Sequence, residues 1–441
     1  MKGELQMSNN SKAYERLTAL FDGGSFTEID PFAKSAEGDI EVVAGFGLVG
    51  GAYAYAFSQD KEVCGGAVTV AQCAKIKKVY DLAQKTGYPI IGVYDSNGVK
   101  LTEGFEVLSA YGEIVKASAR VSGVVPQISV VAGACLGTSA LMANMGDVVV
   151  AVKDADFYVT APSEVTAQDG AEGGVVDIFA DSFDDAVNSV KTLVAMLPSN
   201  NLDVSGYLSF NEPQTAVSEN INALELVNAV ADSGSVLELK ADYASNVVTA
   251  FASFGGEAAG VIAFDGNALC PKCAYKAEAM VKLCDAFSIP LVTIADADGF
   301  AGDCEAPLLT AVTKLTSAYA SATCPKISLI TKQAVGGAYI VLAGKGANAD
   351  LTFAWDTAVA SPLDTDSAVA FLWGDRLADG EDRAALEKEY KETIGSAYTA
   401  AACGAVDDVF TPEMTRAKLC AALDMLSGKR ETTLPRKHSV K

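Results

Sequence analysis

GSFTEID, at residues 24–30, opens a stretch that the chain repeats as GSVLELK at residues 234–240. The repeat continues in the same order, because VVAGFGLVGG at residues 42–51 is matched by VVTAFASFGG at residues 247–256. The two copies of each block lie roughly 200 residues apart, whereas the units of a solenoid repeat every 20–50 residues or so. The pattern therefore predicts two copies of one larger folding unit.

Two further pairs of blocks extend the repeat toward the end of each copy. Residues 74–98, which end in TGYPIIGVYDSNG, correspond to residues 275–299, which end in FSIPLVTIADADG. VPQISVVAGACLGTSA at residues 125–140 corresponds to CPKISLITKQAVGGAY at residues 324–339. Each copy has the size of a single domain, so we expect two similar domains in tandem.

Short apolar runs rich in β-branched residues and bounded by Gly or Pro alternate with helical patterns. Such runs are typical of buried strands in a sheet that helices cover, so the fold class is predicted to be α/β. The predicted strands are residues 128–133, 147–152, 289–296 and 326–331, and the predicted helices are residues 74–86, 277–287, 379–390 and 411–427.

Turn-forming residues gather between the two copies, from Leu197 to Pro213, and indicate a linker. We place the boundary near Ser205, which gives predicted domains at residues 1–205 and 206–441. Because pockets favour domain interfaces, a site built between the two lobes is the first functional hypothesis.

The composition excludes some functions. A net charge of −23 argues against nucleic acid as a partner, since phosphate binding requires a basic surface. Half of the residues are hydrophobic (50%), yet no apolar run reaches the roughly 18 residues of a membrane span, so we expect self-association into a homo-oligomer. The polar start MKGELQMSNNSK lacks the apolar core of a secretory signal, and a cytoplasmic location is expected.

The chain has a single histidine, His438, so a histidine-based triad or a multi-histidine metal site is not expected. Two Gly-rich turns follow buried strands, at residues 133–140 and 334–339. Small residues that enter a helix leave its first N–H groups able to hold an oxyanion. Tight packing of helix against strand explains the same glycines equally well.

A dozen blocks in order, from Tyr14 to His438, resemble the carboxyltransferase subunits of biotin-dependent acyl-CoA carboxylases and decarboxylases of the propionyl-CoA and methylmalonyl-CoA type. They include AKIKKVYDLAQKTGYPIIGVYDSNG, PKISLITKQAVGGAY, GAVDDVFTP and KRETTLPRKH. The resemblance implies two tandem crotonase-type spiral domains, with the acyl-CoA on the N-terminal domain and biotin on the C-terminal one. It also implies a coenzyme A thioester as substrate and a homo-oligomer, either a dimer or a trimer of dimers. The biotin sits on a separate carrier protein, and the further partners are a biotin carboxylase or membrane decarboxylase subunits.

The mechanism that this resemblance implies needs no histidine. Carboxybiotin releases CO2 in a water-poor cleft, the biotin nitrogen takes an α-proton from the acyl-CoA, and the thioester enolate captures the CO2. Each half-reaction develops negative charge on a carbonyl oxygen. By position, Gly137 and Thr138 would serve the thioester, and Gly337 and Ala338 the biotin ureido oxygen.

The chain departs from the family pattern on the turns that are expected to face ligands. Residues 64–69 read CGGAVT and residues 96–100 read SNGVK, while Thr138 replaces the second glycine of the first turn. We predict that ligand contacts come from these turns and from the second Gly-rich turn, at Gly65, Gly66, Asn97, Gly98, Lys100, Gly336 and Ile340. For any single one of the basic residues a solvated surface position is the more common explanation, but contacts with the CoA phosphates would have to come from Lys75, Lys100, Lys116 or Arg120.

Three alternatives remain open. The altered turns are also compatible with a catalytically silent paralogue that scaffolds or regulates such a complex. Hydration or isomerisation of an acyl-CoA would require a carboxylate near the first turn, for which Glu103 is the candidate. Cys270 and Cys273 form a single CxxC motif at the start of a predicted helix. The two cysteines are structural thiols, a redox-active pair or ligands of a metal.

Overall fold

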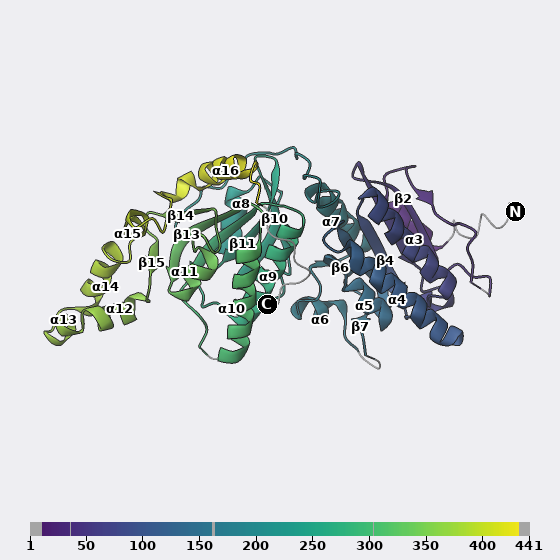
Figure 1. Cartoon of the computed structure of the whole chain (residues 1–441), viewed down its shortest axis with the longest axis horizontal. Helices are drawn as coiled ribbons and strands as arrows, with labels where there is room; N and C mark the ends of the chain where they lie inside the picture. Colours follow the sequence, from purple (N-terminus) through teal and green to yellow (C-terminus); the bar gives the residue numbers. More distant parts are fainter. Residues whose placement is uncertain (1–10, 36, 161–163, 303, 432–441) are drawn as a thin grey trace. The chain divides into compact units, whose positions relative to one another are not determined.

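The computed structural model describes residues 11–35, 37–160, 164–302 and 304–431. The chain divides into two compact units. One unit, here called the N-unit, comprises Met1–Gly206 together with Lys240–Tyr243. The other, the C-unit, comprises Tyr207–Leu239 together with Ala244–Lys441. Each contains a mixed sheet covered by helices (Figure 1).

The N-unit sheet has eight strands in the order β1-β2-β3-β4-β5-β6-β8, with β7 paired to β5. β2 and β3 form an antiparallel hairpin, and the strands from β3 onward run parallel. Every residue of β4 is buried, as expected for a parallel strand covered on both faces. The strands are β1 (Thr27–Glu28), β2 (Val42–Val49), β3 (Ala52–Gln59), β4 (Ile90–Ser96), β5 (Gln127–Leu136), β6 (Val148–Val152), β7 (Phe157–Tyr158) and β8 (Ile178–Ala180).

The C-unit sheet matches the N-unit sheet strand for strand, in the order β9-β10-β11-β12-β13-β14-β16, with β15 paired to β13. Even the irregularities coincide, because the ladder between β4 and β5 shifts after Tyr94 and that between β12 and β13 shifts after Ala295. The predicted duplication is therefore present in the fold. The strands are β9 (Leu237–Leu239), β10 (Val247–Phe254), β11 (Glu257–Phe264), β12 (Leu291–Ala297), β13 (Lys326–Val335), β14 (Leu351–Trp355), β15 (Val359–Ser361) and β16 (Asp408–Phe410).

Two long helices follow the hairpin in each unit, α3 (Val70–Thr86) with α4 (Gly104–Val121), and α9 (Pro271–Ala286) with α10 (Glu305–Ser321). α3 begins before the predicted position because Thr69 caps it, with its Oγ1 accepting the Gln72 N–H at 3.3 Å. α9 likewise begins earlier than predicted, with Pro as its first residue. Sequence periodicity marks the apolar face of a helix but misses the capping turn that precedes it.

The predicted helix at residues 379–390 is wrong in its extent. The segment begins after α13 (Gly374–Ala378) has ended, and its helix, α14 (Arg383–Glu392), starts four residues later than predicted and extends two residues further. The two helices are separated because Gly380 adopts φ 92° and the side chain of Asp382 caps α14 by accepting the Ala385 N–H at 3.0 Å. The predicted helix at residues 411–427 is observed as a 3-10 turn (Pro412–Met414) followed by α16 (Thr415–Leu426).

An aspartate anchors the hairpin in each unit. Asp22 accepts the N–H groups of Gly50 and Gly51 at 3.1 and 2.8 Å. Asp232 does the same in the C-unit, at 2.9 and 2.8 Å from the corresponding Gly255 and Gly256. Asp232 also accepts from Ser253 Oγ at 2.7 Å and Arg416 Nη2 at 2.6 Å. The C-unit anchor therefore carries twice as many side-chain and backbone donors on its carboxylate.

The remaining helices complete the two units, and no helix or strand lies between α7 and α8. Among the described residues, no helix is long and apolar enough to cross a membrane. The other helices are α2 (Lys12–Leu20), α5 (Thr138–Ala143), α6 (Ala167–Glu172), α7 (Phe183–Met196), α8 (Ala223–Val230), α11 (Gly337–Leu342), α12 (Thr365–Leu372) and α15 (Ala397–Ala402).

Candidate active-site turns

In the N-unit, β5 runs into the short helix α5 through a sharp turn at Gly137. Gly137 has φ 58° and ψ −119°, a conformation that L side chains rarely adopt. Its N–H donates to the carbonyl oxygen of Tyr158 in β7 at 3.0 Å. The residues that follow, Thr138 and Ser139, form the start of α5, and we call residues 137–139 the N-turn.

The C-unit repeats this turn in detail. Gly336, between β13 and α11, has φ 56° and ψ −125°, and its N–H donates to the carbonyl oxygen of Ser361 in β15 at 2.8 Å. Residues 336–338 form the C-turn. Gly137 therefore corresponds to Gly336, and Thr138 corresponds to Gly337.

This register bears on the predicted role of Gly137. Gly137 was expected to donate to an oxyanion, but β7 already uses its N–H, and β15 uses that of Gly336 in the same way. A donor engaged in a sheet ladder is not available to a ligand. The positions in the N-turn that match Gly337 and Ala338 are Thr138 and Ser139.

The amides of the two residues that follow this glycine in each turn are not used by the sheet. Within the described parts of the chain, the N–H groups of Thr138, Ser139, Gly337 and Ala338 make no hydrogen bond. The N–H groups of the first residues of a helix have no acceptor within the helix. These four amides can therefore donate hydrogen bonds to an acceptor atom of a ligand. Paired amides at a helix start can stabilise negative charge on a carbonyl oxygen.

The side chain of Ser139 links the N-turn to helix α4. Its hydroxyl lies 3.2 Å from the Tyr111 hydroxyl, and both side chains are buried. Burial, partly offset by the hydrogen bond to Ser139, raises the pKa of Tyr111 to about 12, so the phenol stays neutral. The buried hydroxyl of Thr138, by contrast, has no hydrogen-bond partner among the described residues.

The predicted residues around the N-turn come together in the structure. The carbonyl oxygen of Gly65 accepts the Asn97 N–H at 3.0 Å, and Ser96 Oγ donates to the carbonyl of Gly66 at 2.6 Å. A Cβ built on Gly98 would lie 3.6 Å from Thr138 Oγ1. Sequence reasoning did not single out Ser96, whose hydroxyl links the two loops.

Gly66 illustrates how closely these loops approach. It has φ 65°, and a Cβ built there would lie 2.3 Å from the carbonyl oxygen of Asp95. We expect Gly66→Ala to lower the free energy of unfolding by about 3 kcal/mol, because backbone strain and the clash add. Gly104→Ala is the matched control, since Gly104 has φ 59° with open space around its Cβ position. Urea unfolding should show a clearly larger loss for Gly66→Ala, and equal losses would contradict the close approach.

Several predicted charged residues are already engaged. Lys75 is 2% exposed and donates to the carbonyl oxygen of Val42 at 3.1 Å, so it cannot contact CoA phosphates, contrary to its inclusion as a candidate. Lys100 forms an ion pair with Glu37, and this hydrogen bond raises the pKa of Lys100. Glu103, the candidate base for a hydratase, caps α3 instead, with Oε2 accepting the Val70 N–H at 2.6 Å.

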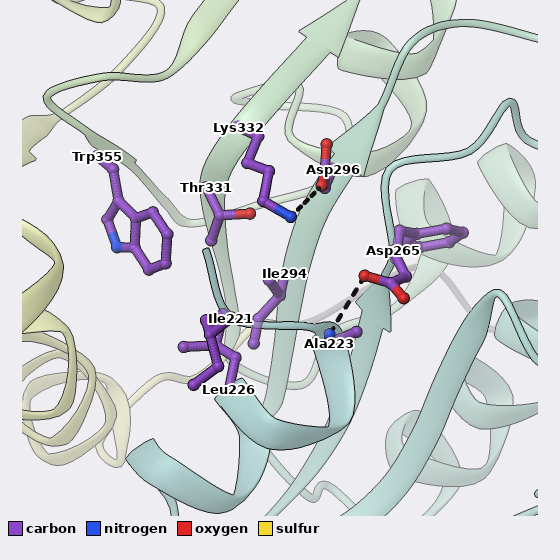
Figure 2. A pocket seen from close by; sticks show the side chains of 10 residues that line it. Ile221, Ala223, Leu226, Asp265, Ile294, Asp296, Thr331, Lys332 and Trp355 are labelled. Atoms are coloured by element: carbon purple, nitrogen blue, oxygen red, sulfur yellow. Dashed lines mark hydrogen bonds and ion pairs between the residues drawn. The ribbon is translucent and has the colours of Figure 1, made fainter. Parts of the chain in front are cut away.

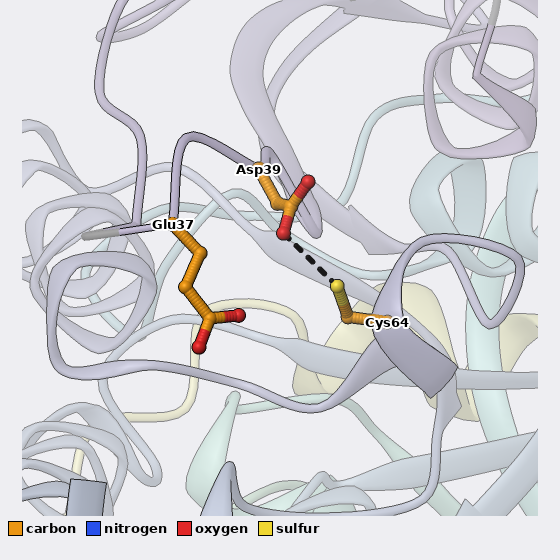
Figure 3. Close-up of side chains that lie close together, drawn as sticks. All are labelled: Glu37, Asp39 and Cys64. Carbon is orange, nitrogen blue, oxygen red and sulfur yellow. Dashed lines mark hydrogen bonds between the residues drawn. The ribbon is translucent and has the colours of Figure 1, made fainter. Parts of the chain in front are cut away.

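A carboxylate oxygen of Glu37, one of Asp39 and the sulfur of Cys64 lie close together, as in a metal site (Figure 3). Cys64 Sγ donates to Asp39 Oδ2 at 3.0 Å. This hydrogen bond raises the pKa of the exposed Cys64 thiol, which disfavours the thiolate that binds metals. Because Lys100 neutralises Glu37, the group behaves as a hydrogen-bonded surface cluster.

In the C-unit, an aromatic side chain covers the C-turn. A Cβ built on Gly337 would lie 2.4 Å from Cε2 and 2.7 Å from Cζ of Phe300. Phe300 is 42% exposed and follows Gly299, the counterpart of Gly98. Ile340 lies on α11 with its side chain 55% exposed, as its predicted ligand-facing role requires. The contact with Phe300 was not predicted, although the Gly-Phe pair was visible in the sequence.

Two cavities lie beside the end of β13, close in sequence to the C-turn. The smaller, about 10 Å³, has room for at most one water (Figure 2). At its edge Lys332 Nζ lies 3.3 Å from Asp296 Oδ2. Burial raises the pKa of Asp296, and the charge of Lys332 offsets this rise only in part. The larger, about 580 Å³, is lined by polar side chains that include Lys332, Gln333 and Lys391. Its volume suits a small ligand.

Known proteins share this architecture over nearly the whole chain. The family model described as carboxyl transferase domain matches residues 6–440. The methylmalonyl-CoA decarboxylase subunit alpha of Veillonella parvula is 33% identical over 474 residues, which cover 97% of this chain and 92% of that protein. The propionyl-CoA carboxylase beta chain of Saccharopolyspora erythraea is 34% identical over 487 residues, covering 97% and 89%.

A solved structure agrees with these relatives. The crystal structure of transcarboxylase 12S with methylmalonyl-coenzyme A and methylmalonic acid bound superposes with a TM-score of 0.90 at 31% identity. The match covers 99% of this chain and 93% of that one. The predicted fold class, α/β with two tandem crotonase-type domains, is confirmed. The chain belongs to the carboxyl transferase family of the biotin-dependent propionyl-CoA and methylmalonyl-CoA carboxylases and decarboxylases.

Proposed function

We propose that this protein is the carboxyltransferase component that moves a carboxyl group between biotin on a separate carrier protein and a short-chain acyl-CoA. The observation that carries the proposal is the pair of matched turns, each with a left-handed glycine tied into the sheet and two open amides after it. A chain that needs two oxyanion sites has kept the same main-chain device in both units.

The N-turn suits a thioester carbonyl. Loss of an α-proton or of CO2 from an acyl-CoA leaves negative charge on the thioester oxygen, and the amides of Thr138 and Ser139 supply donors for it. In the adjoining loop, Gly98 has no side chain on its side toward the turn, where a Cβ would lie 3.6 Å from Thr138 Oγ1. The N-unit is thus proposed as the acyl-CoA side.

The C-turn suits the ureido oxygen of biotin. Biotin supplies the nitrogen that carries the carboxyl group, and its carbonyl oxygen needs donors but no counter-charge. The amides of Gly337 and Ala338 fit that requirement, and Phe300 and Ile340 offer apolar surface beside them. The proton that leaves the acyl-CoA needs no side-chain base of this chain, in keeping with its single histidine.

Two observations favour the second candidate, a silent paralogue that organises a carboxylase or decarboxylase complex. Phe300 packs directly on the C-turn, and Lys100, a predicted phosphate contact, is held by Glu37. If these contacts persist with ligands present, the chain would bind partners without turnover.

The two candidates separate in one assay. Purified protein is mixed with free biotin and malonyl-, methylmalonyl- or glutaconyl-CoA, the loss of the carboxylated thioester is followed, and CoA binding is measured by calorimetry. We expect biotin-dependent turnover of at least one thioester. Thioester binding without turnover, or neither binding nor turnover, would contradict the catalytic proposal and leave the scaffold.

Assembly and location are part of the same proposal. Transcarboxylase 12S is described as a hexamer assembly within a multienzyme core. For this chain we propose a homo-oligomer, a dimer or a trimer of dimers, in the cytoplasm, with a biotin carrier protein as partner. Light scattering on purified protein should give a mass well above 45.6 kDa, and a monomer would contradict it.

A further inference from the structure

Cys270 and Cys273 form a disulfide in the first turn of α9. Their Cα atoms are 5.1 Å apart, within the range that a disulfide spans without backbone movement. Of the three possibilities left open for this CxxC motif, which are structural thiols, a redox site and a metal site, the structure therefore favours the redox site.

The two sulfurs differ in access. Cys270 is the capping residue and is partly exposed, whereas Cys273 is 1% exposed. The N–H of Cys273 donates to Cys270 Sγ at 3.2 Å. Cys270 therefore has the access that an attacking cysteine needs, at a helix start, a position where reactive cysteines are often found. This is the arrangement of an attacking and a resolving cysteine.

The N-unit shows that the fold does not need sulfur here. Thr69 caps α3 at the position of Cys270, and Gln72 occupies the position of Cys273. The Thr69 hydroxyl makes the same capping hydrogen bond that Cys270 makes. The cysteine pair is thus an addition to a cap that already works without it.

The pair is connected to the C-turn through one residue. Leu269, which precedes Cys270, donates to the carbonyl of Gly299 at 2.9 Å and accepts the Ala301 N–H at 3.2 Å. Phe300, between them, packs against Gly337. A change in the backbone at Cys270 would therefore be transmitted through Leu269 to Phe300, the residue that covers the C-turn.

We propose that Cys270 and Cys273 are a reversible thiol–disulfide exchange site whose co-reactants are small disulfides and dithiols, and that the oxidised form holds the bridge between Leu269 and Phe300 in place. In oxidation, the Cys270 thiolate attacks a small disulfide, forms a mixed disulfide and releases one thiolate. Cys273 then loses its proton and attacks Cys270 Sγ, which releases the second thiolate. Two protein thiols are oxidised, and one small disulfide is reduced to two thiols. The thiol–disulfide exchange does not depend on the proposed function. Only an effect of the exchange on carboxyl transfer would depend on it.

Trypsin offers a direct readout, because Lys272 lies between the two cysteines. The folded protein is equilibrated with glutathione disulfide or dithiothreitol, alkylated and digested without reduction. After oxidation, peptide 241–272 should remain joined to peptide 273–276, and after dithiothreitol both should appear alkylated and separate. The exposed thiols of Cys64 and Cys403 serve as internal controls for alkylation. Absence of the joined peptide after oxidation, or its survival until the protein is unfolded, would overturn the exchange site.

Hydrogen exchange tests the connection to the C-turn. The amide of Ala301 should exchange several-fold more slowly in the oxidised protein than in the reduced protein. The matched variant Cys270→Thr/Cys273→Gln copies the N-unit cap, so it should fold normally and show one exchange rate under both conditions. Equal rates in the two states of the natural protein would overturn the structural part of the proposal, as would a redox response that the variant retains.

Discussion

Gly337→Val is expected to lower biotin-dependent turnover by about 100-fold or more while the protein remains folded. The magnitude corresponds to the loss of one oxyanion donor, about 3 to 4 kcal/mol of barrier. A side chain at Gly337 must displace Phe300, whose ring atom Cε2 would lie 2.4 Å from its Cβ, and it would stand beside the amide that we assign to the ureido oxygen. Because Phe300 is 42% exposed, its ring can move without disrupting the core.

Gly374→Val provides the control. Gly374 is the first residue of α13, as Gly337 is of α11, and nothing lies within 4 Å of its Cβ position. The two variants share the same helix-propensity cost, so circular dichroism and urea unfolding should agree for both. Turnover with free biotin should fall only for Gly337→Val. If that variant kept full activity, the C-turn would not be the biotin side.

Asp232→Ala should cost about 3 to 5 kcal/mol of stability at neutral pH, the typical cost of removing one partner from a buried, fully paired charge. Its carboxylate is 1% exposed and receives two amides, one hydroxyl and the Arg416 guanidinium. Burial would raise the pKa of Asp232, but the hydrogen bonds from Gly256, Ser253 and Arg416 outweigh it, and the pKa lies below the usual 3.8. Chemical denaturation of both proteins at pH 7 measures the difference.

The pH dependence gives a second check on Asp232. A carboxylate whose pKa is lower in the folded protein stabilises it fully above the unfolded pKa, and this contribution disappears as the pH falls through the folded pKa. The difference between natural protein and Asp232→Ala should therefore be constant from about pH 5 to 7 and shrink below pH 3.8. The N-unit counterpart, Asp22→Ala, removes only two amide contacts and should cost about 1 kcal/mol. Equal costs at Asp22 and Asp232 would show that the Arg416 contact adds nothing.

The fold was accessible from the sequence because its signals are local. Strand runs bounded by Gly or Pro, and their recurrence in the second copy, are visible without any knowledge of packing. The Gly-rich turns were also found at the correct places along the chain. The linker composition between α7 and α8 fits a segment without helix or strand.

The open amides of the C-turn are the two that were predicted, Gly337 and Ala338, whereas those of the N-turn lie one residue further along the chain than predicted. Which amide stays open depends on the pairing of Gly137 with Tyr158 and of Gly336 with Ser361, and these short strands carry no strong pattern of their own. Lys75 failed as a surface candidate for a similar reason, since its ammonium group on α3 donates to the carbonyl of Val42 in the distant strand β2. Contacts between distant segments decide both cases.

Tying each turn to its sheet has a consequence for how this protein can change over evolutionary time. The direction of the open amides is set by the main chain of β5 and β13, so a substitution such as threonine for glycine at 138 alters the side-chain surface while the amide dipoles keep their direction. If these amides hold the oxyanion as we propose, new acyl groups can be accommodated by side-chain replacement alone, without a change in the main chain of the turn.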